Sequence, residues 1–282
     1  LFDTADVYGD GRSEELIGAF LQQSGAGAIP VATKMGRRAD QVPENYKMEH
    51  FRAWTERSRR LLAQDTLDLV QLHCPPSAVI DDDATYDALD QLVSEGVIAA
   101  YGVSVETMDQ ALSALRRPNL TNLQIIFNPF RLKPLDEVLP LAVEKGVAVF
   151  ARVPLASGLL SGKYTTDTTF DKDDHRTYNR NGEAFDKGET FSGVPFAEGV
   201  AAADELKAAL PEGMTLPAAT LAWIASRPGI TSVIPGARSA EQAEANAAAA
   251  DLLEGGFDLD AFDTLVRDVY DRRLRAEIHP QW

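Results

Sequence analysis

Short apolar stretches alternate along this chain with amphipathic segments of helical spacing. The first stretch opens the sequence at Leu1 and Phe2, and six others follow at residues 29–35, 67–73, 99–105, 123–128, 147–153 and 232–236. Apolar runs of this length between turn residues are typical of buried strands. Between them, apolar residues recur three and four positions apart, which is the periodicity of an amphipathic helix. The pattern therefore predicts seven β-strands separated by α-helices.

Strict alternation of strands and helices predicts a parallel sheet, since parallel neighbours need a crossover connection between them. We expect an α/β fold, a TIM barrel, forming one domain over residues 1–282. A complete barrel has eight strands. The first βα unit is therefore expected to precede these residues, which leaves the domain incomplete at its N-terminus. A doubly wound sheet is the competing architecture, but no G-x-G-x-x-G motif follows any predicted strand.

Two segments depart from the alternation. Residues 165–194 are polar and rich in Asp, Thr and Gly, and they follow the strand that would be the seventh of a complete barrel. Long loops in compact domains are usually functional lids or disordered, so we expect a lid at the catalytic face. Residues 259–282 predict a final amphipathic helix, with Phe262, Val266 and Val269 on one face.

Composition and charge narrow the classes of partner. The chain has 27 basic and 43 acidic residues, which gives a formal net charge of −16. Such a surface repels nucleic acid and anionic membranes, so we expect neither as a partner. No apolar run approaches the length of a membrane span. The single cysteine, Cys74, excludes an internal disulfide and fits a reducing cytoplasm.

Polar residues stand where the predicted strands end. In a barrel these strand ends meet at one mouth, where the active sites of this fold lie. The chain supplies, in order, Asp3 with Tyr8 in the following loop, Lys34, His73, Ser104, Gln124 with Asn128, Arg152, and finally Gly236 and Arg238. We therefore expect these side chains to converge on one polar site.

The first four of these residues suggest proton chemistry. A buried Lys34 needs a carboxylate partner, and Asp3 is available. A cation beside Tyr8 favours the phenolate form, which makes Tyr8 a better proton donor near neutral pH. His73 beside them would orient a carbonyl oxygen. Each residue taken singly also fits an ordinary role as a rim lysine or tyrosine, a loop aspartate or a core histidine.

The motifs around these residues resemble those of the aldo-keto reductases over essentially the whole chain. They are D-T-A-D-V-Y-G at residues 3–9, T-K at 33–34, L-D-L-V-Q-L-H at 67–73, Y-G-V-S at 101–104, P-L-A-S-G-L-L-S-G-K-Y at 154–164 and V-I-P-G-A-R-S-A-E-Q at 233–242. Any one motif would be weak, whereas the spaced set is highly specific. The resemblance implies an NADP-dependent oxidoreductase that reduces small-molecule aldehydes or ketones to alcohols without a metal.

The resemblance also implies a catalytic tetrad of Asp3, Tyr8, Lys34 and His73. Tyr8 would be the general acid toward the carbonyl oxygen, Lys34 and Asp3 would tune its acidity, and His73 would orient the substrate. The hydride would come from NADPH, so the protein positions and polarises the reactants. The sequence names neither the physiological carbonyl compound nor an oligomeric state.

Contacts to the cofactor follow from the same resemblance. Ser104 and Gln124 match residues that hold the carboxamide of the nicotinamide. Arg152 stands where many relatives stack an aromatic ring on the nicotinamide, and Val105 where many have an asparagine. The pyrophosphate and adenosine phosphate would be held by Leu155, Ser157, Gly158, Lys163, Gly236, Arg238, Gln242 and Asn246.

Some of these residues, and the function as a whole, allow other interpretations. Ser239 and Gln242 also form the pattern of a helix capping box. A nucleotide-sensing auxiliary protein, of the type of the channel β-subunits, would share the fold and the tetrad, and a long N-terminal extension would favour it. An aldolase would instead use Lys34 as a Schiff-base lysine. The reductase is the hypothesis that we favour.

Overall fold

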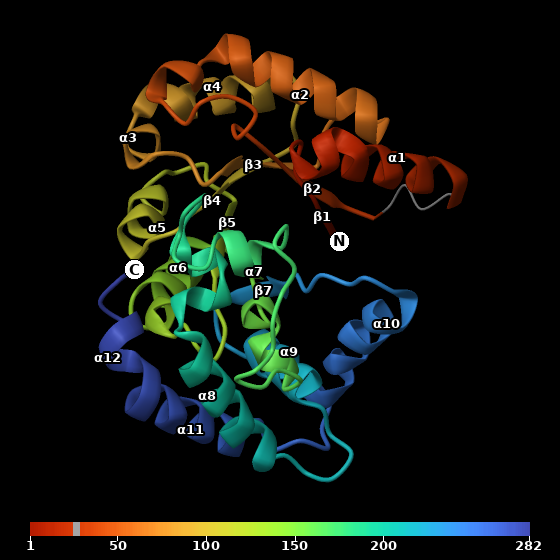
Figure 1. The fold of residues 1–282 in the computed structure, drawn as a ribbon. Helices are drawn as coiled ribbons and strands as arrows, with labels where there is room; N and C mark the ends of the chain where they lie inside the picture. The colour runs from red at the N-terminus through yellow and green to blue at the C-terminus, as the bar shows by residue number, and fades with distance from the viewer. Residues whose placement is uncertain (25–28) are drawn as a thin grey trace. The chain divides into compact units, whose positions relative to one another are not determined.

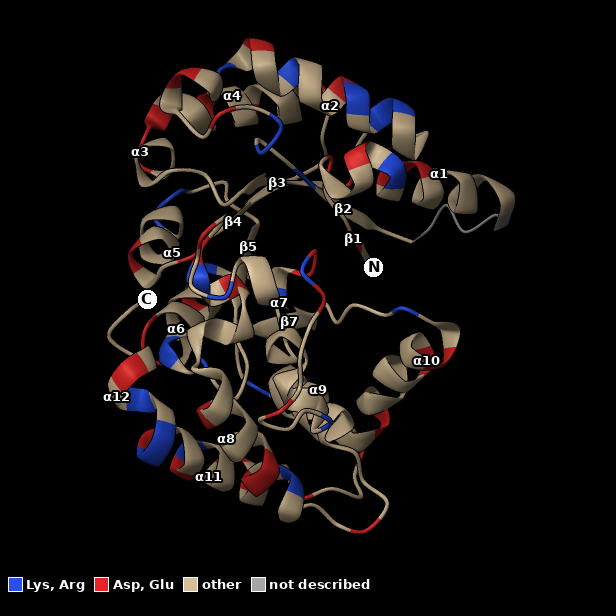
Figure 2. Ribbon diagram, viewed as in Figure 1, with Lys and Arg blue, Asp and Glu red and all other residues tan. Residues whose placement is uncertain are grey.

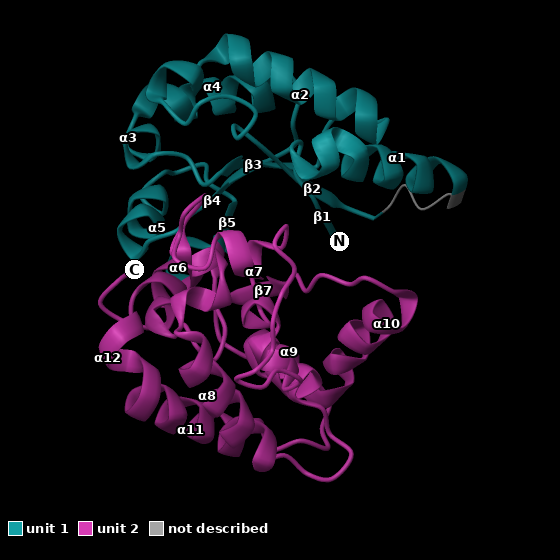
Figure 3. Cartoon of the chain, viewed as in Figure 1, with its two compact units in different colours: residues 1–124, 144–148 teal, residues 125–143, 149–282 magenta. Residues whose placement is uncertain are grey.

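The structure is a computed structural model that describes residues 1–24 and 29–282 (Figure 1). The chain divides into two compact units (Figure 3). Unit 1 comprises Leu1–Gln124 and Glu144–Ala148, and unit 2 comprises Ile125–Val143 and Val149–Trp282.

Unit 1 contains a parallel sheet in which strands that follow one another along the chain are neighbours. The strands are β1 (Phe2–Asp3), β2 (Val31–Met35), β3 (Leu69–His73), β4 (Tyr101–Ser104) and the first part of β5 (Asn122–Ile126). The register places Asp3 opposite Ala32 and His73 opposite Ser104. Because the strands are parallel, the polar residues at their carboxyl ends lie along one edge of the sheet.

Helices connect the strands of unit 1. They are η1 (Tyr8–Gly11), α1 (Arg12–Ser24), η2 (Pro43–Asn45), α2 (Met48–Leu62), α3 (Ser77–Ile80), α4 (Asp83–Ser94) and α5 (Met108–Ala114), where η marks a 3-10 helix. In α2, Phe51, Thr55, Ser58 and Leu62 are buried at helical spacing. The other positions of α2 include four arginines (Figure 2). The amphipathic pattern in the sequence therefore corresponds to a helix with one buried face and one polar face.

Most of the remaining elements belong to unit 2. Strands β6 (Ala148–Arg152) and β7 (Ile230–Val233) pair in parallel. The helices are η3 (Lys133–Leu135), α6 (Val138–Lys145), η4 (Ala156–Ser161), α7 (His175–Tyr178), η5 (Lys187–Glu189), η6 (Phe191–Gly193), α8 (Phe196–Ala208), α9 (Leu216–Ala225), α10 (Ala240–Ala248), η7 (Ala249–Leu253), α11 (Leu259–Val269), α12 (Arg275–Ile278) and the π-helical turn η8 (Tyr270–Leu274).

Strands β2 and β4 of unit 1 are buried along their whole length. All five residues of β2 and all four residues of β4 are buried. Burial on both faces is typical of parallel strands, and it explains why these segments read as continuous apolar runs in the sequence. Lys34 is the one charged residue of β2, and its side chain is only 1% exposed. Its charge must therefore be balanced locally.

The structure confirms the predicted alternation of seven strands with helices. The last strand was wrongly placed at residues 232–236, since β7 is Ile230–Val233; Pro235 has no N–H group for a ladder bond. The fifth strand ends at Ile126, before Asn128, whose Oδ1 accepts a hydrogen bond from Phe130 N at 2.9 Å and forms a turn.

Other predictions about the architecture stay predictions. These are the closure of a barrel, a missing first βα unit, the single domain and the lid at residues 165–194. That segment contains the short helices α7, η5 and η6, so it has local structure of its own. Among the described residues, we find no helix with the length and apolar character needed to cross a membrane.

Candidate active site

An ion pair between Asp3 and Lys34 lies at the first two strand ends of unit 1. Lys34 Nζ is 2.6 Å from Asp3 Oδ1 and donates a second hydrogen bond to Thr4 O at 2.7 Å. Neighbouring strands β1 and β2 bring the two side chains together. The ion pair expected from the sequence is confirmed. Two charge-assisted bonds hold the buried ammonium in one orientation.

The other oxygen of Asp3 belongs to a network of side-chain amides. Gln124 Nε2 donates to Asp3 Oδ2 at 2.8 Å and to Gln71 Oε1 at 3.1 Å. Gln71 Nε2 in turn donates to Asn122 Oδ1. The predicted site residue Gln124 is thus fixed by its two N–H groups, which leaves its carbonyl oxygen to accept from a ligand.

Two members of this network, Gln71 and Asn122, were missed by the sequence analysis. Both are fully or almost fully buried. The signal was present, because Gln71 is a polar residue in the middle of the apolar run L-D-L-V-Q-L-H. A buried amide inside a strand requires a partner, and that requirement points to a neighbouring polar strand residue.

Tyr8 and His73 lie against each other beside the ion pair. Their ring centroids are 5.9 Å apart with an interplanar angle of 82°, an edge-to-face contact. Lys34 Nζ lies 5.5 Å from the centroid of the Tyr8 ring. His73 is buried, whereas Tyr8 is 43% exposed. The structure therefore brings together all four residues of the predicted tetrad and leaves the tyrosine accessible to a ligand.

Ser104 stands at the end of the next strand. It is opposite His73 in the register of β3 and β4, and its Oγ lies 3.4 Å from the sulfur of Cys74. Together with Gln124 it brings the predicted nicotinamide contacts of unit 1 to the same strand ends as the tetrad. Six predicted site residues are thus linked through contacts or strand register within one compact unit.

In unit 2, two predicted cofactor residues contact the segment predicted to be a lid. Arg152 NH1 is 2.6 Å from Glu189 Oε1, and the two side chains are 8% and 20% exposed. Ser157 Oγ donates to Glu189 O at 3.1 Å and accepts from Phe191 N at 3.0 Å. Leu155 and Gly158 belong to the same turn, joined by a bond from Gly158 N to Leu155 O at 2.9 Å. Lys163 is exposed.

The predicted adenosine phosphate residues gather at the start of α10 in unit 2. Ser239 is the N-cap, and its Oγ accepts from Gln242 N at 3.3 Å. Gln242 Oε1 accepts from Arg238 N at 2.8 Å, and Asn246 Nδ2 donates to Gly236 O at 3.2 Å. The cap is confirmed on the serine side. The glutamine side chain binds Arg238 N in place of the N-cap N–H, so the reciprocal half of a capping box is not formed.

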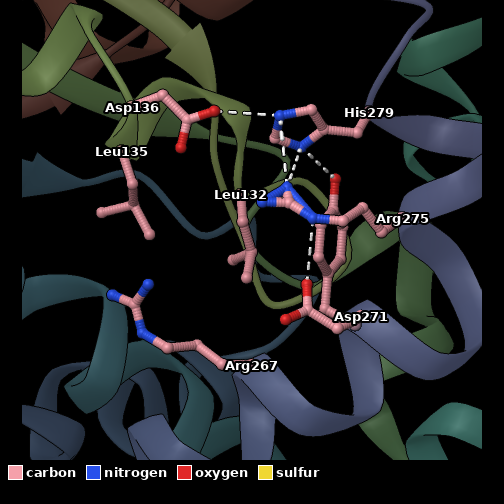
Figure 4. Close-up of a pocket in the computed structure, with 8 residues that line it drawn as sticks. Leu132, Leu135, Asp136, Arg267, Asp271, Arg275 and His279 are labelled. Carbon is pink, nitrogen blue, oxygen red and sulfur yellow. Dashed lines mark hydrogen bonds and ion pairs between the residues drawn. The ribbon is translucent and has the colours of Figure 1, made fainter.

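A small polar pocket in unit 2 contains none of the predicted site residues (Figure 4). His279 Nε2 is 2.9 Å from Asp136 Oδ2 there, and His279 Nδ1 is 3.2 Å from Tyr270 Oη. Burial raises the pKa of Tyr270 to about 12. These contacts join the C-terminal helices to the turn before α6, which is a structural role.

Asp6, also missed by the sequence analysis, lies in the loop that carries Tyr8. It is fully buried, and neither carboxyl oxygen has a hydrogen-bond partner among the described residues. Burial, together with the nearby carboxyl of Glu14, raises the pKa of Asp6 to about 7, although Arg38 and Arg57 act in the opposite direction. A carboxyl without partners takes the neutral form more readily than one in water.

Known proteins resemble this chain in both sequence and fold. A family model described as the aldo/keto reductase family matches residues 1–256. The chain is 30% identical over 254 residues to the uncharacterized oxidoreductase YqkF of Bacillus subtilis, covering 88% of this chain and 76% of that protein. It is 29% identical over 268 residues to a probable voltage-gated potassium channel subunit beta of Arabidopsis thaliana, covering 89% and 78%.

Solved structures agree with the sequence comparison. The glycerol dehydrogenase AKR11B4 from Gluconobacter oxydans superposes with a TM-score of 0.75 at 30% identity, covering 99% of this chain and 83% of that one. An aldo-keto reductase from Klebsiella pneumoniae, solved in complex with NADPH, has the same fold with a TM-score of 0.67 at 22% identity, covering 95% and 79%. On the family model, the sequence identity and the shared fold, this chain belongs to the aldo/keto reductase family.

Proposed function

We propose that this protein reduces small-molecule aldehydes or ketones to alcohols with NADPH, with Tyr8 as the general acid. The observation that carries the proposal is the placement of the accessible Tyr8 beside both the Lys34 ammonium and the His73 ring. A phenol placed beside a buried cation is suited to giving up a proton. Membership of the aldo/keto reductase family supports an oxidoreductase.

Each member of the tetrad has a distinct proposed role. Tyr8 gives its phenolic proton to the carbonyl oxygen of the substrate. The Lys34 ammonium stabilises the negative charge that develops on Tyr8, and Asp3 keeps that ammonium charged and oriented. His73 directs the carbonyl oxygen toward Tyr8. NADPH, when bound, supplies the hydride to the carbonyl carbon, so carbonyl, hydride and proton together give the alcohol.

The residues present fit a nicotinamide cofactor. In unit 1, Gln124 has committed its N–H groups to Asp3 and Gln71, and its carbonyl oxygen suits the amino group of a carboxamide. In unit 2, a helix N-terminus and the Arg238 guanidinium suit a phosphate. Solved relatives that contain NADPH or NADP support the same cofactor. For Ser157 to reach the pyrophosphate, Glu189 and Phe191 must release its hydroxyl.

The direct experiment is to follow the loss of NADPH absorbance with a panel of small aldehydes and ketones. Carbonyl-dependent oxidation of NADPH supports the proposal, and its absence across the panel, with the cofactor bound, counts against it. In that case the similarity to a potassium channel subunit beta would favour a nucleotide-binding auxiliary protein. A Schiff-base aldolase is disfavoured, because Lys34 Nζ is engaged with Asp3 Oδ1 and Thr4 O, whereas a Schiff-base lysine needs a free amine to attack a carbonyl.

The choice between the two nicotinamide cofactors gives a testable expectation for Arg238. A guanidinium beside a helix start grips a 2′-phosphate, which NADPH has and NADH lacks. Replacing Arg238 with Ala should therefore raise the dissociation constant for NADPH by roughly 10- to 100-fold, the equivalent of a charge-assisted bond of about 1.5–3 kcal/mol. Glu241 in the first turn of α10 opposes this attraction, so we expect preference and not exclusivity.

The dissociation constants of NADPH and NADH, measured by titration on the parent and on Arg238→Ala, test this expectation. NADH is the internal control, since its affinity should stay nearly unchanged. Equal affinity of the parent for both cofactors would show that Arg238 does not select between them.

A further inference from the structure

The turn that carries Tyr8 has an unusual backbone. Gly9, Asp10 and Gly11 follow Tyr8 with φ angles of 58°, 55° and 94°. These angles lie in the left-handed region, which suits glycine but costs an aspartate roughly 1 kcal/mol. Three such residues in a row need support from outside the turn to keep one conformation. The direction of the Tyr8 side chain depends on that support.

Arg57 of α2 provides part of it. Its NH2 donates to Asp10 O at 2.7 Å, and its NH1 donates to Asp6 O at 3.2 Å. The guanidinium lies so close to Gly11 that a Cβ at that position would overlap it. Arg57 is therefore bonded to main-chain carbonyls on both sides of Tyr8, and Gly11 provides the space that its guanidinium occupies.

Arg38, from the loop after β2, contacts the same two places. Its NH1 donates to Asp6 O at 3.1 Å, and its NH2 is 2.7 Å from Asp10 Oδ1. Two guanidinium groups from separate segments thus bridge the residues before and after Tyr8. We call Arg38 and Arg57 the arginine clamp.

The arginine clamp differs from a pair of surface ion pairs, which contribute little to the stability of a fold. The side chains of Arg57 and Arg38 are 24% and 28% exposed. A buried carboxyl lies next to Arg57, since Glu14 is fully buried with its Oε2 3.9 Å from Arg57 NH1. Glu14 Oε1 accepts a hydrogen bond from Thr33 Oγ1 of β2 at 2.6 Å. Glu14 therefore ties Arg57 to the strand that carries Lys34.

We propose that the arginine clamp positions Tyr8 for proton transfer, with Arg57 as its principal member. The clamp connects α2 and the loop after β2 to the turn, and so fixes the Tyr8 phenol relative to Lys34 and His73. Both arginines act through the turn and not on the reacting atoms in this proposal, so both are positioning residues. The proposal rests on the proposed function, since it concerns the efficiency of the same proton donor.

The variant Arg57→Ala tests the proposal. Small displacements of a reacting group cost about 10²-fold in rate, so kcat should fall by at least roughly tenfold. The KM for the aldehyde and the dissociation constant of NADPH should change little. Arg57→Lys, which keeps the charge but has no fork of donors, should recover part of the loss. Arg60→Ala is the matched control, because Arg60 is an exposed arginine on the same helix.

The rate must be expressed per molecule of enzyme that binds NADPH, measured by titrating the binding sites. A variant that is only less well folded loses sites, and its kcat per site stays that of the parent. Parental kcat per site in Arg57→Ala overturns the proposal, and a lower value at unchanged NADPH affinity supports it. If Arg57→Ala does not fold, Arg38→Ala and Arg57→Lys decide by the same criterion. A parent enzyme that reduces no carbonyl compound would instead contradict the proposed function.

Discussion

Replacing Tyr8 with Phe is expected to lower kcat for aldehyde reduction by about 10²–10⁴-fold, the usual contribution of a positioned general acid. The substitution removes only the phenolic oxygen. The Phe ring keeps the edge-to-face contact with His73 and the position next to Lys34, so the fold and the NADPH affinity should be those of the parent. Steady-state rates with NADPH and one good aldehyde measure the loss.

A matched control is available in Tyr178→Phe. Tyr178 is 46% exposed, close to the exposure of Tyr8, and makes a similar edge-to-face contact with Phe185. This variant should keep the parental kcat. If Tyr8→Phe also retains most of its kcat, the proton comes from another group and the proposed role of Tyr8 is wrong.

Replacing Asp6 with Asn is expected to stabilise the protein at pH 8 and to leave its stability nearly unchanged at pH 4. The pKa of Asp6 is about 7 in the folded protein and about 4 in the unfolded chain. The folded state binds the proton more tightly, so the free energy of unfolding falls as pH rises from about 4 to 7. An amide avoids that loss because it carries no ionisable proton.

The expected gain at pH 8 is roughly 2–4 kcal/mol, since one unit of pKa shift corresponds to about 1.4 kcal/mol. Urea unfolding of parent and variant at both pH values measures it. The titratable and charged groups that interact electrostatically with the Asp6 carboxyl come from three segments. They are Glu14 from α1, Arg57 from α2, and Arg38 and Tyr46 from the loop between β2 and α2. Asp167→Asn, at an exposed loop position, is the control and should change neither value. An unchanged or lower stability of Asp6→Asn at pH 8 would mean that Asp6 is satisfied in the folded protein.

The convergence of Asp3, Lys34 and His73 was predictable from a local rule, whereas the catalytic role of each tetrad residue followed from the resemblance to the aldo-keto reductases. Polar residues interrupt apolar runs at strand ends, and parallel strands carry those ends to one edge. The contact between Lys34 and Asp3 also follows from elementary electrostatics, since a buried ammonium requires an anion. The structure agrees, with 2.6 Å between the two charged groups.

The arginine clamp was not predictable in this way. Arg57 is 51 positions from Asp6 along the chain, and helical periodicity identifies it only as a residue of the polar face of α2. Which polar residue meets which loop depends on how the helices pack. The burial of Asp6 has the same origin, because an aspartate within a loop motif is usually exposed.

Strand ends were predicted less well where side chains compete with the ladder. Asn128 lies in an apolar context that favours a longer strand, but its amide oxygen binds the backbone of Phe130 and turns the chain. Pro235 ends the last strand for lack of an N–H group. Both residues are known turn formers, and the apolar pattern outweighed them in the prediction.

The central claim is that hydride passes from the nicotinamide to a carbonyl carbon bound beside Tyr8. The most direct measurement uses NADPH with deuterium at both hydrogens of the reactive ring carbon, and mass spectrometry of the alcohol formed. The account predicts one deuterium on the carbinol carbon, and a strong reduction in the amount of labelled alcohol formed by Tyr8→Phe over the same time. An alcohol without deuterium, or bound NADPH that is never oxidised by any carbonyl compound tested, would contradict it.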